Sequence, residues 1–142
     1  MSRSELDATR DFRRPRFDFF GPALAAAAGV VYVLHGFHGY LSRDLGLYAY
    51  SGQQFAEGVP PYVAPLNRSG PLAQMIPGLG AVLARWTGGD DVIWMRYVCL
   101  VLAVIGVWVA YLFGRDLFRS RTAGVVTALA LIINAGFITY AS

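Results

Sequence analysis

The sequence predicts an all-α integral membrane protein with about three transmembrane helices and two amphipathic surface helices in its first extracytoplasmic loop. The composition is the first reason, because 56% of the 142 residues are hydrophobic and only 15% are charged, whereas soluble domains are about 25% charged. The second reason is the presence of three long apolar runs that are almost free of charge. The third is that the arginines gather at the ends of those runs and form no basic patch of the kind that binds nucleic acid.

The first apolar run covers residues 19–41 and contains no charged side chain. At about 1.5 Å per residue, a helix of this length crosses the roughly 30 Å hydrocarbon core of a bilayer. Residues 1–18 precede it and mix five arginines with four acids without an apolar period. This segment is therefore predicted to be a solvated, arginine-rich tail.

Two further spans are predicted at residues 92–113 and 122–142. Three arginines lie in the short connection 114–121 and five in the tail, against three in the longer loop 42–91. Because cytoplasmic segments next to membrane spans are enriched in arginine and lysine, the tail and the 114–121 loop are predicted to be cytoplasmic. The expected location is the cell membrane, with several passes, a cytoplasmic N-terminus and an extracytoplasmic 42–91 loop.

The 42–91 loop contains two stretches in which apolar residues recur with helical spacing. The first stretch starts at Leu45, has glutamines and a glutamate on its opposite face, and can end at Gly58. The second follows Pro71, and its apolar stripe consists of Leu72, Met75, Ile76, Leu79, Leu83 and Trp86. Both stretches are predicted to be helices that lie on the membrane surface.

Three charged residues at the outer membrane surface are candidates for chemistry. Asp44 follows the first span directly, where its carboxylate would act as a general base toward an acceptor hydroxyl or as the N-cap of the first surface helix. Arg68 precedes the second surface helix, and Arg96 lies in the first turn of the second span. Each guanidinium would bind the phosphate of a lipid-linked donor or meet lipid headgroups.

The remaining candidates are weaker. His35 and His38 lie three residues apart near the outer end of the first span, but two ligands alone do not make a metal site. The cofactor therefore stays unknown, with a divalent cation as one option. Cys99 is the single cysteine, so a disulfide within the chain is excluded. Asp90 and Asp91 are most simply a turn and a cap before the second span.

Five short segments follow one another along residues 40–120. They are Asp44-Leu45-Gly46-Leu47-Tyr48-Ala49-Tyr50, Gly58-Val59-Pro60-Pro61-Tyr62, Gly70-Pro71-Leu72, Met95-Arg96-Tyr97 and Tyr111-Leu112-Phe113-Gly114-Arg115-Asp116-Leu117-Phe118. Their order around a large first outer loop resembles the N-terminal part of the polytopic GT-C class glycosyltransferases of the family-39 type. That group contains the protein O-mannosyltransferases and the aminoarabinose transferase of lipid A.

The resemblance implies an inverting transfer of a sugar from a polyprenyl-phosphate donor to an acceptor hydroxyl on the outer face of the membrane. It also implies that Asp44 is the first-loop acidic residue of the family, a catalytic base or a metal-associated acid. Many relatives carry a second acid directly after this aspartate, where this chain has Leu45. The family often has a lysine where this chain has Ser69, so Arg68, one residue earlier, becomes the candidate phosphate ligand.

Members of that family usually cross the membrane many more times than this chain. The resemblance therefore implies the N-terminal module of a larger GT-C fold, inactive alone and dependent on a missing C-terminal part or on a partner membrane protein. Two other interpretations stay open, a small non-enzymatic polytopic membrane protein that acts as an accessory subunit, and a transporter fragment. Against the transporter, no predicted span carries a charged residue near its centre.

Overall fold

The computed structural model describes residues 18–37, 43–61, 63, 70–134 and 136–137. This part of the chain contains five helices and no strand, so the prediction of an all-α protein is confirmed for it. The helices are α2 (Phe20–Gly36), α3 (Arg43–Ala56), α4 (Leu72–Thr87), α5 (Asp91–Leu117) and α6 (Arg121–Ile133). The predicted tail, apart from Asp18, and the candidate Arg68 lie outside the described residues.

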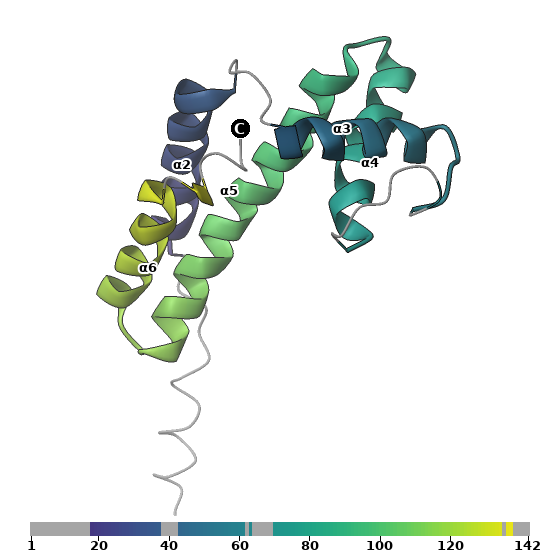
Figure 1. The fold of residues 1–142 in the computed structure, drawn as a ribbon. Helices are drawn as coiled ribbons and strands as arrows, with labels where there is room; N and C mark the ends of the chain where they lie inside the picture. Colours follow the sequence, from purple (N-terminus) through teal and green to yellow (C-terminus); the bar gives the residue numbers. More distant parts are fainter. Residues whose placement is uncertain (1–17, 38–42, 62, 64–69, 135, 138–142) are drawn as a thin grey trace, which may run out of the picture.

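Helix α5 is the axis of the molecule (Figure 1). Helix α6 packs against the C-terminal half of α5 and α4 against the N-terminal half, whereas α2 extends along α5 from Tyr111 to Tyr97. Helix α3 lies on α4 and runs across the direction of α5, so it makes few direct contacts with α5. The chain therefore divides into a three-helix bundle at one end of α5 and a helical pair, α3 and α4, at the other.

By length and composition, α5 is the one described helix that could cross a bilayer. Its 27 residues extend over about 40 Å at 1.5 Å per residue, and it contains the whole predicted span 92–113. Helices α2 and α6 are also apolar, but they are shorter, with 17 and 13 residues. The first predicted span, 19–41, therefore extends beyond α2, and the third, 122–142, extends beyond α6.

The third predicted span, 122–142, is interrupted at Asn134. Helix α6 ends at Ile133, and Asn134 has an extended backbone with ψ of 110°. Its side-chain Oδ1 accepts a hydrogen bond of 2.9 Å from the backbone N–H of Phe137. This local bond is the kind that asparagine offers in place of a continued helix. The predicted span 122–142 placed this residue inside one long helix.

The other helix ends follow the local signals in the sequence. Gly58 adopts a left-handed φ of +86° after α3, and its N–H and that of Val59 donate back to Phe55 and Gln54 over 3.0 Å each. This is the paired pattern of a Schellman ending, as the glycine predicted. Asp90 caps α5 by accepting a 3.0 Å bond from the N–H of Ile93. The predicted turn and cap before the second span are thus confirmed.

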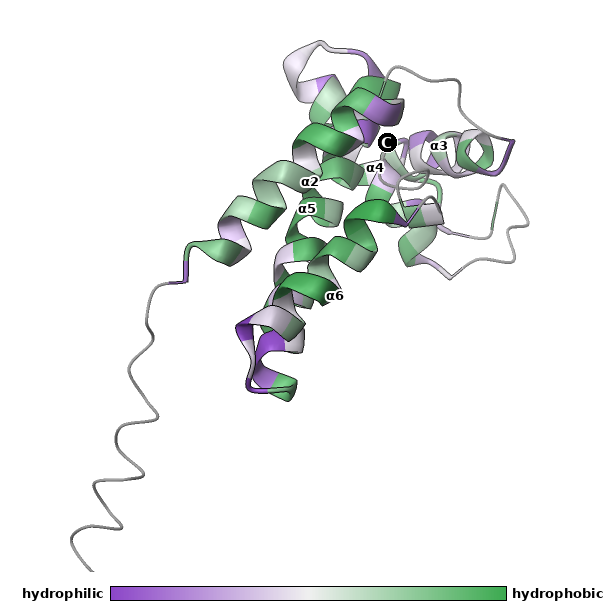
Figure 2. Cartoon of the chain, turned by 90° about the vertical axis from the view of Figure 1, so that its left-hand side faces the viewer, coloured by the Kyte–Doolittle hydropathy of each residue, from purple (hydrophilic) through white to green (hydrophobic). Residues whose placement is uncertain are grey.

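The core of the three-helix bundle combines small side chains with two tyrosines, and consists of Ala28, Tyr32, Ala103, Val107, Tyr111, Ala128 and Ile132. Large apolar side chains of the same helices point outward, among them Leu34, Val109, Phe113 and Ile133. In Figure 2 the three helices are mostly green along their middle and purple at the turn between α5 and α6. The bundle thus has an apolar middle and a polar end.

Helix α4 packs closely against α3 and α5, because glycines at the contacts allow the backbones to approach. A Cβ added to Gly52 of α3 would lie 2.8 Å from the backbone N of Gly78, and one added to Gly80 would lie 2.5 Å from Cα of Met95 in α5. The large apolar residues of α4 face away, and Trp86 is 82% exposed. The predicted apolar stripe of this helix is therefore mostly an outward face, and the small residues form the packing face.

We predict that Gly80→Ala lowers the free energy of unfolding by about 1–3 kcal/mol, because the added methyl group would overlap the backbone of α5. Gly46→Ala is the matched control in α3, since nothing lies within 4 Å of its added Cβ. That variant should be neutral or up to about 1 kcal/mol more stable, because alanine favours helices. Thermal unfolding in detergent, followed by circular dichroism, measures both. Equal effects of the two substitutions would contradict the close contact.

Candidate functional site

A cavity of about 300 Å³ lies where α3, α4 and α5 meet. Its volume is at the lower end of the range for small-molecule pockets. The lining is almost entirely apolar and consists of Leu45, Tyr48, Ala49, Ala73, Ile76, Pro77, Val92, Met95, Arg96 and Cys99. Arg96 is the one charged residue in this set. A cavity of this kind fits an apolar group that carries a single negative charge at its edge.

Arg96 is half-buried, and its guanidinium reaches across to the end of α2. Its Nη1 donates a hydrogen bond to the backbone carbonyl of Phe37, the residue that follows α2. A cation at the carbonyl end of a helix is favoured by the helix dipole. The Phe37 ring in turn packs on Tyr97, with 5.0 Å between the ring centroids. Arg96 is therefore held between the end of α2 and the cavity by the elements around it.

Asp44 lies in the first turn of α3, and its side chain is exposed. The helix begins at Arg43, one residue earlier, so Asp44 is not at the position of the N-cap. Among the described residues, no hydrogen bond or ion pair engages its carboxylate. The next residue, Leu45, lines the cavity. A carboxylate that has no structural partner among the described residues thus lies one residue from a cavity whose lining includes Arg96.

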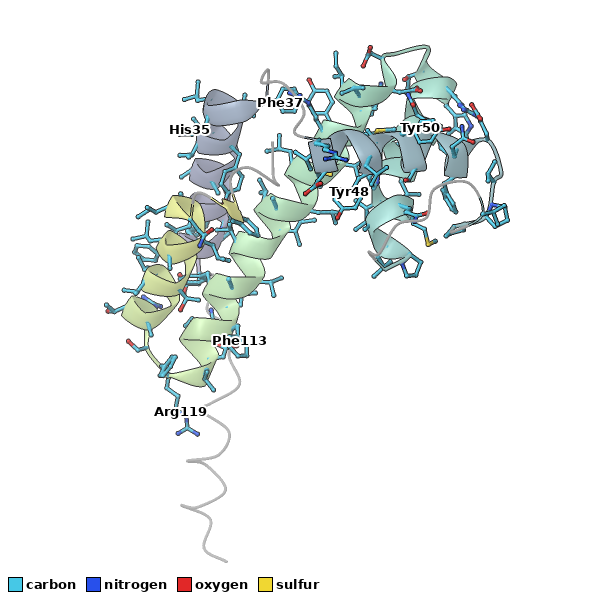
Figure 3. The ribbon with its side chains drawn as sticks, viewed as in Figure 1. His35, Phe37, Tyr48, Tyr50, Phe113 and Arg119 are labelled. Carbon is cyan, nitrogen blue, oxygen red and sulfur yellow. The ribbon has the colours of Figure 1, made fainter. Side chains whose placement is uncertain are left out.

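The residues near the cavity share one end of the molecule. Figure 3 shows His35 and Phe37, at the end of α2, at the level of Tyr48 and Tyr50 of α3, whereas Arg119 lies at the opposite end of α5. Tyr48 lines the cavity, and Tyr50 is exposed. Two of the three predicted site residues, Asp44 and Arg96, are therefore brought to the same end. The third, Arg68, lies outside the described residues.

Polar contacts fix α3 in place beside the cavity. The side-chain amide of Gln53 donates a 3.2 Å hydrogen bond to Asp91 at the start of α5. Arg85 of α4 donates over 2.9 Å to the carbonyl of Ala56, and its guanidinium lies 3.3 Å from the carboxylate of Glu57. An exposed ion pair contributes little to stability on its own. These contacts mainly orient α3 relative to the other two helices.

Within the described ranges, no group of three or more histidines, cysteines, aspartates or glutamates could hold a metal ion. His35 is exposed, and its predicted neighbour His38 falls outside those ranges. Asp44 is followed by Leu45, so no second carboxylate directly follows it in the sequence.

A second buried polar cluster lies at the opposite end of α5, and the sequence analysis missed it. The hydroxyl of Tyr111 donates a 2.5 Å hydrogen bond to Asp18, whose other oxygen accepts a 3.3 Å bond from the N–H of Phe20. Arg115 and Arg121 lie 3.5 and 3.7 Å from the same carboxylate. The Asp18 side chain is only 6% exposed. This cluster ties the starts of α2 and α6 to the end of α5.

The surroundings of Asp18 favour its charged form. The hydrogen bond from Tyr111 is the main cause that lowers the pKa of Asp18 below its usual value of 3.8. The bond from Phe20 and the two arginines act in the same direction, whereas burial opposes them. One signal in the sequence could have found this residue, because Asp18 stands immediately before the first apolar run, at the end where three arginines also gather.

Comparison of the chain with models of protein families, with curated proteins and with solved structures found no match.

We predict that Asp18 stabilises the bundle only while it is charged. Because its pKa is lowered in the folded protein, this contribution is present above the usual pKa of 3.8 and is lost as the pH falls through the lowered pKa. The midpoint of thermal unfolding should therefore fall between about pH 5 and pH 3 more steeply in the wild type than in Asp18→Asn. At pH 7, the variant should unfold several degrees lower, because it loses charge-assisted hydrogen bonds.

The matched control for this prediction is Asp116→Asn, because Asp116 is an exposed carboxylate that pairs with Arg115 at the same end. This variant should unfold close to the wild-type midpoint and keep the wild-type pH dependence. A pH dependence that is identical in the wild type and in Asp18→Asn would contradict the role of Asp18.

Proposed function

We propose that this chain is a membrane-embedded module in which α2, α5 and α6 cross or enter the bilayer. The support for this is the apolar middle of the bundle, with its large outward-facing side chains, and the length of α5. Exposed apolar surface of this kind is expected to be covered by lipid or by protein. The arginines at the α5–α6 turn favour a cytoplasmic location for that end. The cavity and Asp44 then lie at the outer surface.

We further propose that the module belongs to a membrane glycosyltransferase that moves a sugar from a polyprenyl-phosphate donor to an acceptor hydroxyl. The observation that carries this proposal is the apolar cavity, which has Arg96 in its lining and Asp44 beside it. An apolar cavity suits isoprenoid units, and a guanidinium suits a phosphate. A carboxylate that no other described group engages suits proton removal from a hydroxyl.

In this proposal the acceptor oxygen attacks the anomeric carbon of the sugar and loses its proton to the Asp44 carboxylate. The bond between the anomeric carbon and the phosphate oxygen breaks at the same time, and polyprenyl phosphate leaves with the electron pair of that bond. Arg96 stabilises the negative charge that develops on the leaving phosphate. Attack on the face opposite the phosphate inverts the anomeric centre. The remaining substrate contacts would come from a C-terminal part or a partner membrane protein.

A second candidate function is that of a non-enzymatic accessory subunit in the membrane. It is favoured by an open apolar groove of about 500 Å³ between α2 and α5, lined by Ala26, Gly29, Val30, Val33, Leu34, Leu100, Val101, Val104 and Ile105. Transmembrane helices associate through such small and branched residues. If the chain is an accessory subunit, replacement of Asp44 should leave sugar transfer unchanged. This outcome distinguishes the accessory subunit from the glycosyltransferase module.

We predict that polyprenyl phosphate protects Cys99 from a small apolar maleimide, because this single cysteine lines the cavity. The unphosphorylated polyprenol should protect about ten-fold less well, since it lacks the charge-assisted contact with Arg96. Arg96→Gln should remove most of the difference between the two lipids. The measurement is the labelling rate of the purified full chain, read by mass spectrometry.

The control for this experiment moves the cysteine out of the cavity, in the double variant Cys99→Ser with Leu102→Cys. Leu102 is exposed on α5 and lines neither the cavity nor the groove between α2 and α5, so polyprenyl phosphate should not protect it more than polyprenol does. Circular dichroism of Arg96→Gln checks that the loss of the bond to Phe37 leaves the helices intact. Equal protection by both lipids in the wild type would overturn the role of Arg96.

We predict that Asp44→Asn at the native locus lowers sugar transfer in isolated membranes by about two to four orders of magnitude, the usual contribution of a general base. Glu57→Gln is the matched control, because Glu57 is an exposed acid just after the other end of α3. It should retain nearly full activity. Transfer that is undiminished in Asp44→Asn, with wild-type protein levels, would rule out the proposed base.

A further inference from the structure

The outward face of α4 is apolar from its first turn to its last. Leu72, Leu79 and Trp86 follow one another at intervals of seven residues, so they lie on the same side of the helix. All three side chains are exposed, because the other sides of α4 pack against α3 and α5. A row of large exposed apolar side chains is expected to be covered by lipid or by protein.

The apolar surface of α5 continues towards this face of α4. The side of α5 that meets α4 and the cavity includes Met95 and Cys99. At helical spacing after Cys99, the same side of α5 continues with Leu102, Val109 and Phe113, which are all exposed. The surface of the bundle that is proposed above to face lipid therefore leads along α5 to the start of α4.

The contact between Gly80 and Met95 relates the depth of α4 to that of α5. Met95 lies four residues after the start of α5 at Asp91, which is about 6 Å along the helix axis. Because α5 is about 40 Å long and a hydrocarbon core is roughly 30 Å thick, about 5 Å of a centred helix projects at each end. Gly80 therefore lies near the outer edge of the core.

Helix α4 is inclined, so its two ends lie at different depths. Figure 1 shows its first turn at the level of the three-helix bundle and its last turn at the top of the view, next to the start of α5. Leu72 precedes Gly80 by eight residues, or about 12 Å along α4, and Trp86 follows Gly80 by six, or about 9 Å. Leu72 thus lies on the membrane side of Gly80, and Trp86 lies on the water side.

The charge of α4 is distributed in the same way. Arg85 is the single charged residue of this helix and lies in its last turn, beside Trp86. There it pairs with Glu57 over 3.3 Å. The first turn of α4 contains no charged residue, and Leu72 and Met75 are exposed on it. The last turn of α4 therefore suits the polar headgroups, and the first turn suits acyl chains.

We propose that α4 is inserted obliquely into the outer leaflet of the bilayer. Leu72 and Met75 contact the acyl chains, and the indole of Trp86 lies at the headgroups, where tryptophan is enriched in membrane proteins. This differs from a helix that lies flat on the surface, which is the arrangement that the sequence predicts. The proposal rests on the membrane embedding proposed above, but it does not depend on sugar transfer.

The test measures depth at three positions of α4 in the full chain, reconstituted into phosphatidylcholine bilayers. A nitroxide is attached to Leu72→Cys, Leu79→Cys or Trp86→Cys, each in the Cys99→Ser background. Oxygen concentrates among the acyl chains and a nickel chelate stays in water, so the ratio of their collision rates with the nitroxide reports depth. The ratio of oxygen to nickel collisions should be highest at Leu72, intermediate at Leu79 and several-fold lower at Trp86.

Two control variants in the same background calibrate this ratio. Leu102→Cys places the nitroxide on the outward face of α5, and its ratio should be close to that of Leu72→Cys. Glu57→Cys replaces an exposed acid just after α3, and its ratio should be low. Circular dichroism of each labelled variant checks that the helical content is that of the wild type.

The other outcomes overturn the proposal in distinguishable ways. Equal ratios at Leu72 and Trp86 would show a helix that lies flat. Low ratios along α4 with a high ratio at Leu102 would place α4 in water and leave α5 in the membrane. Few collisions of either kind at Leu72 would show that a second copy of the chain covers this face. A low ratio at Leu102 as well would contradict the membrane embedding itself.

Discussion

The close contact of α4 with α3 and α5 is the constraint on which the candidate site depends. Gly52 meets Gly78, and Gly80 meets Met95, at distances that leave no space for a side chain. Pro77 and Met95 take part in these contacts and also line the cavity. The cavity wall therefore begins where the close contacts end. The backbones of α3, α4 and α5 touch at the glycines. Beside these contacts, the larger side chains of the same three helices enclose the cavity.

The parts of the fold that the sequence predicted are those governed by neighbouring residues. The end of α3 at Gly58 and the cap of α5 at Asp90 need only a few adjacent groups. The long apolar run in α5 likewise stands out from composition alone. Asn134 shows the limit of that reasoning, because one asparagine inside an apolar run has two options. It can stay in a helix and pair with a partner, or end the helix and bond to its own backbone.

The packing face of α4 could not be predicted from the spacing of its residues, for another reason. Its large apolar residues and its small residues both recur with helical spacing, and periodicity does not reveal which stripe meets the protein. The glycines decide this, because only they allow the backbones of α3 and α5 to approach. The predicted positions of Asp44 and Arg96 near the outer surface followed from their nearness to span ends. The cavity that relates them needed all three helices, and Arg96 gained a contact with Phe37 that no local pattern indicates.

Asp18 was missed because its partners are far away along the chain, with Tyr111 following it by 93 residues. That separation also orders events during synthesis. At about 5 to 20 residues per second, a ribosome needs roughly 5 to 20 s to reach Tyr111 after making Asp18. Over that interval the carboxylate lacks the partners that hold it in the finished protein. The start of α2 can therefore be fixed against α5 and α6 only late in synthesis, after Tyr111 and Arg121 have been made.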